Sequence, residues 1–148
     1  MSLDLPGVDD RVVVAGQLQP DDMKAVAAAG FTVVVNNRPD GEAMFGQPRT
    51  ADIKAAAEAA GLKFLDLPFS GPRATPEQVR ALADLLAGGE DRIVAFCKSG
   101  MRSALLWGAA CLANGRSLDE VLQGARRAGQ ELEPVADLMT GLARAARG

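Results

Sequence analysis

The stretch from Phe31 to Val35 is a nearly continuous run of apolar, mostly β-branched residues. Such a run is typical of a strand that is covered on both faces, as in a parallel sheet, because a half-exposed strand would alternate with polar residues. Similar short runs occupy residues 11–15, 63–67 and 92–96. With helical segments between them, these runs predict an α/β fold in three layers, a mostly parallel central sheet of about four to five strands flanked by helices.

The segments between the runs have the start and stop signals of helices. Proline or a capping hydroxyl opens most of them, acidic residues follow in the first turn, and glycine ends several. The predicted helices begin near Pro20 and end at Gly30, and then span residues 51–60, 76–87 and 103–113, with two more starting near Ser117 and Glu133.

Length and charge narrow the class of protein. A chain of 148 residues is long enough for one domain with a real core, so we expect a single domain over residues 1–148. A net charge of -3 gives no electrostatic case for nucleic acid as a partner. The first residues have neither a basic region nor an apolar run, so we expect no membrane partner and a cytoplasmic location. The sequence gives no oligomeric state.

The complete absence of histidine limits the available chemistry. It removes serine–histidine triads, cysteine–histidine proteases and histidine-based zinc sites. The two cysteines, Cys97 and Cys111, have the spacing of neither a redox pair nor a zinc knuckle. We therefore expect no metal and no cofactor, and a catalytic role for other side chains.

Cys97 directly follows the predicted strand 92–96 and opens a short loop that leads into a helix. A strand, a small-residue loop and a helix start together form a concave ring of backbone N–H groups, which binds anions. The helix N-terminus, Arg102 and Lys98 should lower the thiol pKa and favour the nucleophilic thiolate. The sequence therefore predicts Cys97 as a nucleophile, whereas Cys111, among apolar residues, is predicted to be a core side chain.

The remainder of the loop suits a small tetrahedral anion. Arg102 offers a planar, permanently charged fork for phosphate, sulfate or thiosulfate. Ser103 is assigned to catalysis with Cys97 and Arg102 if its hydroxyl bonds the sulfur, and it could equally serve only as a helix cap. Gly100 permits a tight turn with its amide facing inward. The predicted anion-binding residues are Lys98, Ser99, Gly100, Met101 and Arg38.

Further polar residues follow the other predicted strands. Arg38 is either a second contact for the anion or, as we favour, the ion-pair partner of Asp40 or Glu42. Asp40 and Asp66 are the candidates for a catalytic acid, although each could be only a solvated or capping side chain. Met44 and Phe45 either line the mouth of the substrate site or, as we favour, form a small apolar cluster under their loop.

With strand, cysteine loop and helix placed, the chain resembles the beta-lactamase-hydrolase-like protein, phosphatase-like domain family, a relative of tyrosine and dual-specificity phosphatases. The resemblance implies a phosphatase-like α/β fold, Cys97 as nucleophile and Arg102 as anion ligand. The motifs that support it are Ala15-Gly16-Gln17, Val34-Val35-Asn36-Asn37-Arg38-Pro39-Asp40-Gly41-Glu42, Leu67-Pro68 with Ser70-Gly71, and Cys97-Lys98-Ser99-Gly100-Met101-Arg102-Ser103.

The length of the loop leaves three functions open. Tyrosine phosphatases place five residues between cysteine and arginine, whereas this chain has four, a length similar to that of rhodanese-type sulfurtransferases. We favour sulfur transfer through a Cys97 persulfide, because that step needs no general acid. The alternatives are hydrolysis of a phosphomonoester through a phosphocysteine and anion binding without turnover. The expected partner is accordingly a small anionic substrate, either thiosulfate or a persulfide, or a phosphomonoester.

Overall fold

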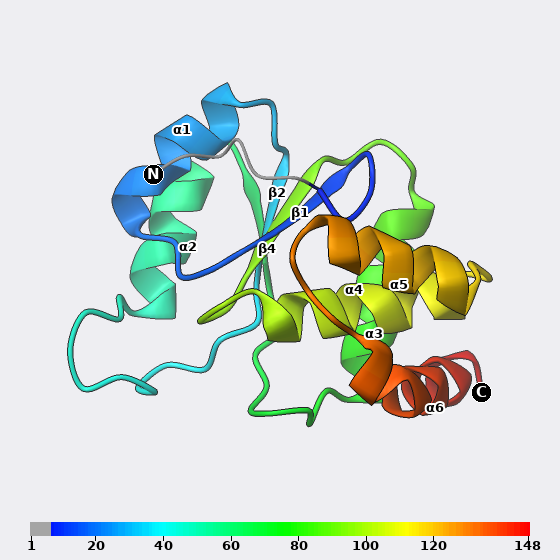
Figure 1. The fold of residues 1–148 in the computed structure, drawn as a ribbon. Coiled ribbons are helices and arrows are strands. Elements are labelled where there is room, and N and C mark those ends of the chain that lie inside the picture. The colour runs from blue at the N-terminus through cyan, green and yellow to red at the C-terminus, as the bar shows by residue number, and fades with distance from the viewer. Residues whose placement is uncertain (1–6) are drawn as a thin grey trace.

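The computed structural model describes residues 7–148, and its centre is a sheet of four parallel strands (Figure 1). The strands are β1 (Val12–Ala15), β2 (Val33–Asn36), β3 (Lys63–Asp66) and β4 (Ile93–Phe96). They lie in the order β1-β4-β2-β3, and the register pairs Val14 with Ala95 and Val35 with Ala95 on either side of β4. The predicted α/β class, the parallel sheet and its strand count are confirmed.

Helices connect the strands and continue to the end of the chain. Three of the predicted helix starts are observed with capping: Gln19 before the first turn, Thr75, and Ser117, each in a capping box. Among the described residues no helix is long and apolar enough to cross a membrane. The helical elements are η1 (Pro20–Asp22), α1 (Met23–Ala28), α2 (Thr50–Ala59), α3 (Pro76–Ala87), α4 (Met101–Ala113), α5 (Leu118–Arg127), η2 (Glu133–Val135) and α6 (Ala136–Arg147).

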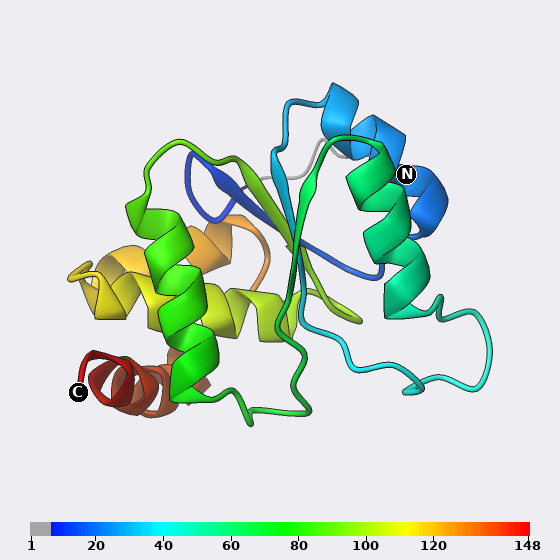
Figure 2. The same ribbon diagram turned by 180° about the vertical axis from the view of Figure 1, so that it is seen from behind.

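The helices form a layer on each face of the sheet, as the two opposite views show (Figures 1 and 2). Alternate strand residues point to opposite faces. Val33 and Val35 therefore belong to the core beneath α3, α4 and α6, whereas Val34 belongs to the core beneath α1 and α2. Burial on both faces explains why the first three residues of β2, Val33 to Val35, are all apolar.

The sheet brings the carboxyl ends of all four strands to one edge. β4 lies between β1 and β2, so the residue after β4, Cys97, has neighbours on both sides: its N–H donates to the Ala15 carbonyl, and the N–H of Asn37 donates to the Phe96 carbonyl. Ligands of open parallel sheets bind at this edge. The fold thus places the cysteine loop in the middle of the region where a site is expected.

The predicted start of the helix after Cys97 is wrong, and this boundary affects the site. The helix after Cys97 was expected to begin at Ser103, but α4 begins at Met101, with Gly100 as its N-cap. The cause is the backbone of Gly100, which has a φ of 94°, a left-handed conformation that glycine adopts without steric cost. The helix N-terminus therefore lies inside the cysteine loop, closer to the thiol than the sequence indicated.

Helix α4 is surrounded by other elements, and its packing depends on glycine. Residues Ser103 to Cys111 are all buried, and Trp107 lies against α5. A Cβ atom at Gly124 of α5 would overlap the Val8 carbonyl oxygen and come within 2.9 Å of the Trp107 ring. The close approach of α5 to α4 therefore requires glycine at this position.

We predict that Gly124→Ala lowers the free energy of unfolding by about 1–3 kcal/mol, because backbone and ring must shift to admit the methyl group. The matched control is Gly141→Ala in α6, where an added Cβ meets no atom within 4 Å. That variant should be more stable by about 0.5–1 kcal/mol, since alanine favours a helix. Denaturant unfolding of both variants measures these changes. A Gly124→Ala protein with the free energy of unfolding of the wild type would contradict the close contact at Gly124.

Candidate active site

Cys97 is held at the base of a ring of backbone N–H groups. Its side chain is only 1% exposed, and the N–H of Gly100 lies 3.1 Å from Sγ. Burial raises the pKa of the thiol, but hydrogen bonds from the backbone N–H groups of Ser103, Ser99, Gly100 and Arg102 lower it. The net result is a thiol pKa below its ordinary value.

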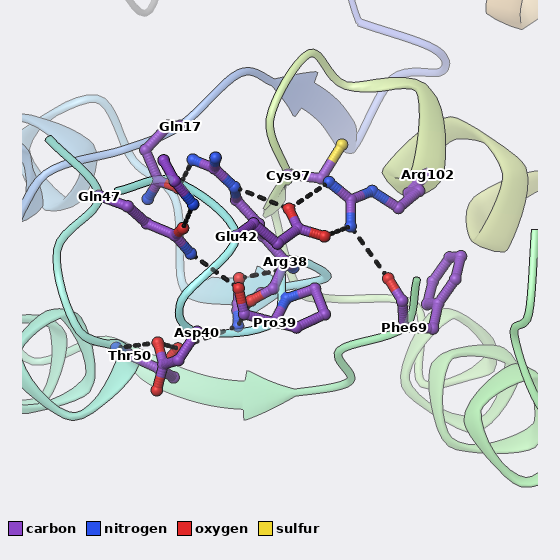
Figure 3. A network of polar contacts seen from close by, with 12 residues as sticks. Gln17, Arg38, Pro39, Asp40, Glu42, Gln47, Thr50, Phe69, Cys97 and Arg102 are labelled. Carbon is purple, nitrogen blue, oxygen red and sulfur yellow. Dashed lines mark hydrogen bonds and ion pairs between the residues drawn. The ribbon is translucent and has the colours of Figure 1, made fainter. Parts of the chain in front are cut away.

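One edge of the Arg102 guanidinium, formed by Nη1 and Nη2, is occupied by a carboxylate of the same chain (Figure 3). Nη1 lies 2.7 Å from Glu42 Oε2 and Nη2 lies 2.9 Å from Glu42 Oε1, which is a bidentate pair. Nη1 also donates to the Phe69 carbonyl at 3.0 Å. The guanidinium is thereby fixed between the loop after β2 and the loop after β3.

Arg38 forms the second half of the same ion-pair network. Its Nε lies 2.9 Å from Glu42 Oε1, and its Nη1 donates to Gln17 Oε1 at 2.8 Å. The structure therefore shows the ion pair with Glu42 that the sequence analysis favoured. The two guanidinium groups lower the pKa of the Glu42 carboxyl to about 2, Arg102 through its hydrogen bond being the largest cause, while burial acts in the opposite direction.

The Ser103 hydroxyl has neither of its predicted roles. It donates to Asn37 Oδ1 at 2.8 Å, so it neither bonds the sulfur nor caps α4. Asn37 in turn donates to the Leu67 carbonyl at 2.9 Å. This buried chain of hydrogen bonds ties the cysteine loop to the ends of β2 and β3, and it is the backbone N–H of Ser103 that acts on Cys97.

Neither candidate acid is brought to the thiol. The Asp40 carboxylate accepts hydrogen bonds from the backbone N–H and the hydroxyl of Thr50, at 2.8 and 2.7 Å, which is a cap on the first turn of α2. Asp66 is the last residue of the outer strand β3, and its carboxylate accepts from Asn36 Nδ2 at 2.8 Å. Asp40 therefore has the capping role that the sequence left open, whereas Asp66 is bonded across the strand pair β2–β3.

A cavity of about 700 Å³ lies beside the arginine pair, within the size range of small-molecule sites. The predicted residues Lys98 and Met101 line it together with Arg38 and Arg102. The Ser99 carbonyl instead accepts from Gln130. The full lining is Arg38, Glu42, Ala43, Gly71, Pro72, Lys98, Met101, Arg102, Leu105 and Val135.

The expectation of an apolar cluster under the loop after β2 is wrong. Met44 is 89% exposed and Phe45 is 86% exposed, so neither packs beneath its loop. Cys111, in contrast, is buried within α4 as expected, and burial raises the pKa of its thiol to about 12. Both thiols are buried, but the pKa of Cys97 is lowered and the pKa of Cys111 is raised.

Two contacts at the site were missed by sequence reasoning. The resemblance implied that Asn37 lies near the pocket rim, but not that it accepts from Ser103, and the pair of Glu42 with Arg102 was not expected. Both belong to the stretch Asn36–Glu42 that was noted for its resemblance, but Glu42 was considered only as a partner for Arg38. The sequence position of Glu42, sixty residues before Arg102, gave no sign of the second pairing.

The comparison with protein families agrees with this geometry. The model of the family "Beta-lactamase hydrolase-like protein, phosphatase-like domain" matches residues 4–114. The chain belongs to this family. A beta-lactamase hydrolase-like protein of Agrobacterium fabrum is 38% identical over 100 residues, which are 68% of this chain and 23% of the relative. The chain thus matches only about a quarter of the length of these curated relatives.

Solved structures support the same fold. A crystal structure from Neisseria meningitidis, of a protein proposed to be a phosphatase, has 29% identity and a TM-score of 0.78, and covers 95% of this chain and 99% of its own. Tk-PTP in its active form has 19% identity and a TM-score of 0.72, with 99% and 98% covered. The predicted tyrosine and dual-specificity phosphatase-like fold is confirmed.

The comparisons favour one of the open functions over another. The family is described as phosphatase-like, and the Neisseria meningitidis relative as a proposed phosphatase. They support a phosphatase-like enzyme, and they give no support to the preference for a sulfurtransferase. The phosphatase alternative is therefore the better supported of the two.

We predict that the Cys97 thiol titrates below the ordinary value of about 8.5, because the loop amides favour the thiolate. Thiolate absorbance near 240 nm, followed as a function of pH, measures this without needing access for an alkylating reagent. The low-pH transition should vanish in Cys97→Ser and persist in Cys111→Ala. A Cys97 pKa at or above the ordinary value would show that the backbone N–H groups do not stabilise the thiolate.

Proposed function

We propose that the protein is a cysteine-dependent phosphatase that hydrolyses a phosphomonoester through Cys97. The observation that supports this most is the lowered pKa of a thiol that sits in a ring of N–H groups, next to an arginine whose fork matches an oxyanion. The family membership agrees with it.

The reaction proceeds in two displacements. The Cys97 thiolate attacks phosphorus, the bond from phosphorus to the ester oxygen breaks, and the alcohol or phenol departs with its electron pair. Water then attacks the phosphocysteine, releases inorganic phosphate and restores the thiolate. Backbone N–H groups and the Arg102 guanidinium stabilise the equatorial oxygens in both steps.

The leaving group of a phosphomonoester needs a proton, and the three carboxylates considered at this site do not supply it. Asp40 and Asp66 are hydrogen-bonded elsewhere, and Glu42 is ionised because its pKa is about 2. Protonation therefore comes from water, which is effective only for leaving groups that are already stable as anions. We accordingly propose that phenyl phosphates are better substrates than alkyl phosphates.

The test is turnover of a series of aryl phosphates whose phenols differ in pKa. The rate should rise steeply as the phenol pKa falls, because Asp40, Asp66 and Glu42 do not supply the proton. Cys97→Ser should abolish turnover, and Arg102→Lys should reduce kcat/KM by about a hundredfold.

Asp40→Asn and Asp66→Asn serve as matched controls, each expected to retain the wild-type dependence on the leaving group. If either variant lost activity only towards poor leaving groups, that aspartate would be the acid and the proposed protonation by water would be wrong. Turnover that survived Cys97→Ser would contradict the whole mechanism.

Sulfur transfer is the second candidate, and it is favoured by the hydrogen bonds that hold both candidate acids on other partners. In this reaction the Cys97 thiolate attacks the outer sulfur of thiosulfate, the sulfur–sulfur bond breaks and sulfite leaves. A nucleophile such as cyanide then takes the outer sulfur from the persulfide. Neither displacement needs a proton donor.

We predict that, if this second activity is present, thiosulfate treatment adds one sulfur atom to Cys97, as intact-protein mass spectrometry would detect. Cyanide should then yield thiocyanate in the wild type but not in Cys97→Ser. An unmodified Cys97 would eliminate sulfur transfer. Binding of inorganic phosphate without turnover in either assay would leave the third possibility, an anion-binding module.

A further inference from the structure

We propose that Gln130 is a positioning residue of the cysteine loop, which holds the peptide between Ser99 and Gly100 so that its N–H points at the Cys97 sulfur. The proposal concerns the preparation of the sulfur and does not depend on which group the sulfur accepts. It therefore goes beyond the proposed function and can be tested separately from it.

The peptide between Ser99 and Gly100 has a hydrogen-bond partner on each side. Its N–H, which belongs to Gly100, lies 3.1 Å from Cys97 Sγ. Its carbonyl, which belongs to Ser99, accepts from Gln130 Nε2 at 3.2 Å. The N–H and C=O groups of a planar trans peptide point in opposite directions. A donor that holds the carbonyl outside the loop therefore directs the N–H towards the sulfur.

The backbone of Gly100 does not select this orientation by itself. Turning the peptide over would change the φ of Gly100 from 94° to a negative value, and glycine adopts both conformations about equally well. The turned peptide would direct the Ser99 carbonyl oxygen at the Cys97 sulfur, where its partial negative charge would repel a thiolate. A contact from outside the loop is therefore needed to favour the observed orientation, and Gln130 provides one.

The end of α5 holds the backbone of Gln130 in place. Gly129 has a φ of 79°, and its N–H donates to the Arg126 carbonyl at 3.0 Å. The N–H of Gln130 donates to the Ala125 carbonyl at 2.9 Å, which completes a Schellman motif. Leu132, two residues later, is fully buried in the core. The connection from α5 to η2 is thus anchored on both sides of Gln130 where it passes the start of α4 (Figure 1).

The hydrogen bond from Gln130 also strengthens the bond on the other side of the peptide. Hydrogen bonds in a chain polarise one another, so a donor on the Ser99 carbonyl makes the Gly100 N–H a better donor to the sulfur. The Gly100 N–H is one of the backbone groups that lower the pKa of Cys97. Loss of the Gln130 donor should therefore raise that pKa.

The charged groups around this contact have partners of their own. Arg102 interacts with the Cys97 thiolate through its charge, and Arg126 and Glu131, beside Gln130 in the chain, pair with each other at 3.0 Å. Gln130 itself is neutral. Replacing it by another neutral side chain of similar length therefore removes the hydrogen bond without changing the net charge.

The test is the pKa of Cys97, measured on the whole chain from the absorbance of the thiolate. Gln130→Met keeps an unbranched side chain and removes the donor, and it should raise the pKa of Cys97 by about half a unit to one unit. The matched control is Gln123→Met, the same substitution at an exposed position of α5, which should leave the pKa of Cys97 at the wild-type value.

Gln130→Glu is a second variant. Its ionised carboxylate cannot donate and its charge opposes the thiolate, so the pKa of Cys97 should rise further than in Gln130→Met.

Two results would overturn the proposal. One is a Gln130→Met protein that is less stable in denaturant unfolding but has the Cys97 pKa of the wild type, because Gln130 would then have only a structural role. The other is an equal rise of the pKa in Gln123→Met. Neither measurement requires turnover, so a failure of the phosphatase assignment would leave this test intact.

Discussion

The balance between burial and backbone hydrogen bonds at the Cys97 thiol is the constraint on which the site depends. Removing Cys97 from water favours the neutral thiol, and the N–H groups of the loop oppose this by favouring the thiolate. These N–H groups converge only because β4 ends in the middle of a parallel sheet and Gly100 turns the chain directly into α4. The order of the strands, the left-handed conformation of Gly100 and the start of α4 therefore act together to lower the pKa of Cys97.

Glu42 extends this arrangement across the strand ends. It joins Arg38, from the loop after β2, to Arg102, from the helix after β4, and Arg102 also contacts the loop after β3 through Phe69. Three connections that are distant in sequence thus meet at two guanidinium groups. Glu42 keeps the two guanidinium groups in position, and its negative charge compensates part of their positive charge.

The fold was predictable because each of its elements has a local signal. The apolar run before Asn36 and the capping boxes at Thr75 and Ser117 depend on residues that are adjacent in sequence. The pairing of Glu42 with Arg102 and of Ser103 with Asn37 depends on which strand ends become neighbours, and no local pattern shows that. For the same reason Asp40 and Asp66 looked suitable as acids until the structure showed them bonded to Thr50 and Asn36.

In the proposed reaction the Cys97 sulfur itself receives the phosphoryl group. Rapid acid quenching during turnover of an aryl phosphate, followed by peptide mass spectrometry, detects this intermediate. We expect a phosphoryl group on the peptide that contains Cys97, and none on the peptide that contains Cys111. A phosphoryl group on another residue, or turnover with no phosphorylated peptide at all, would contradict it.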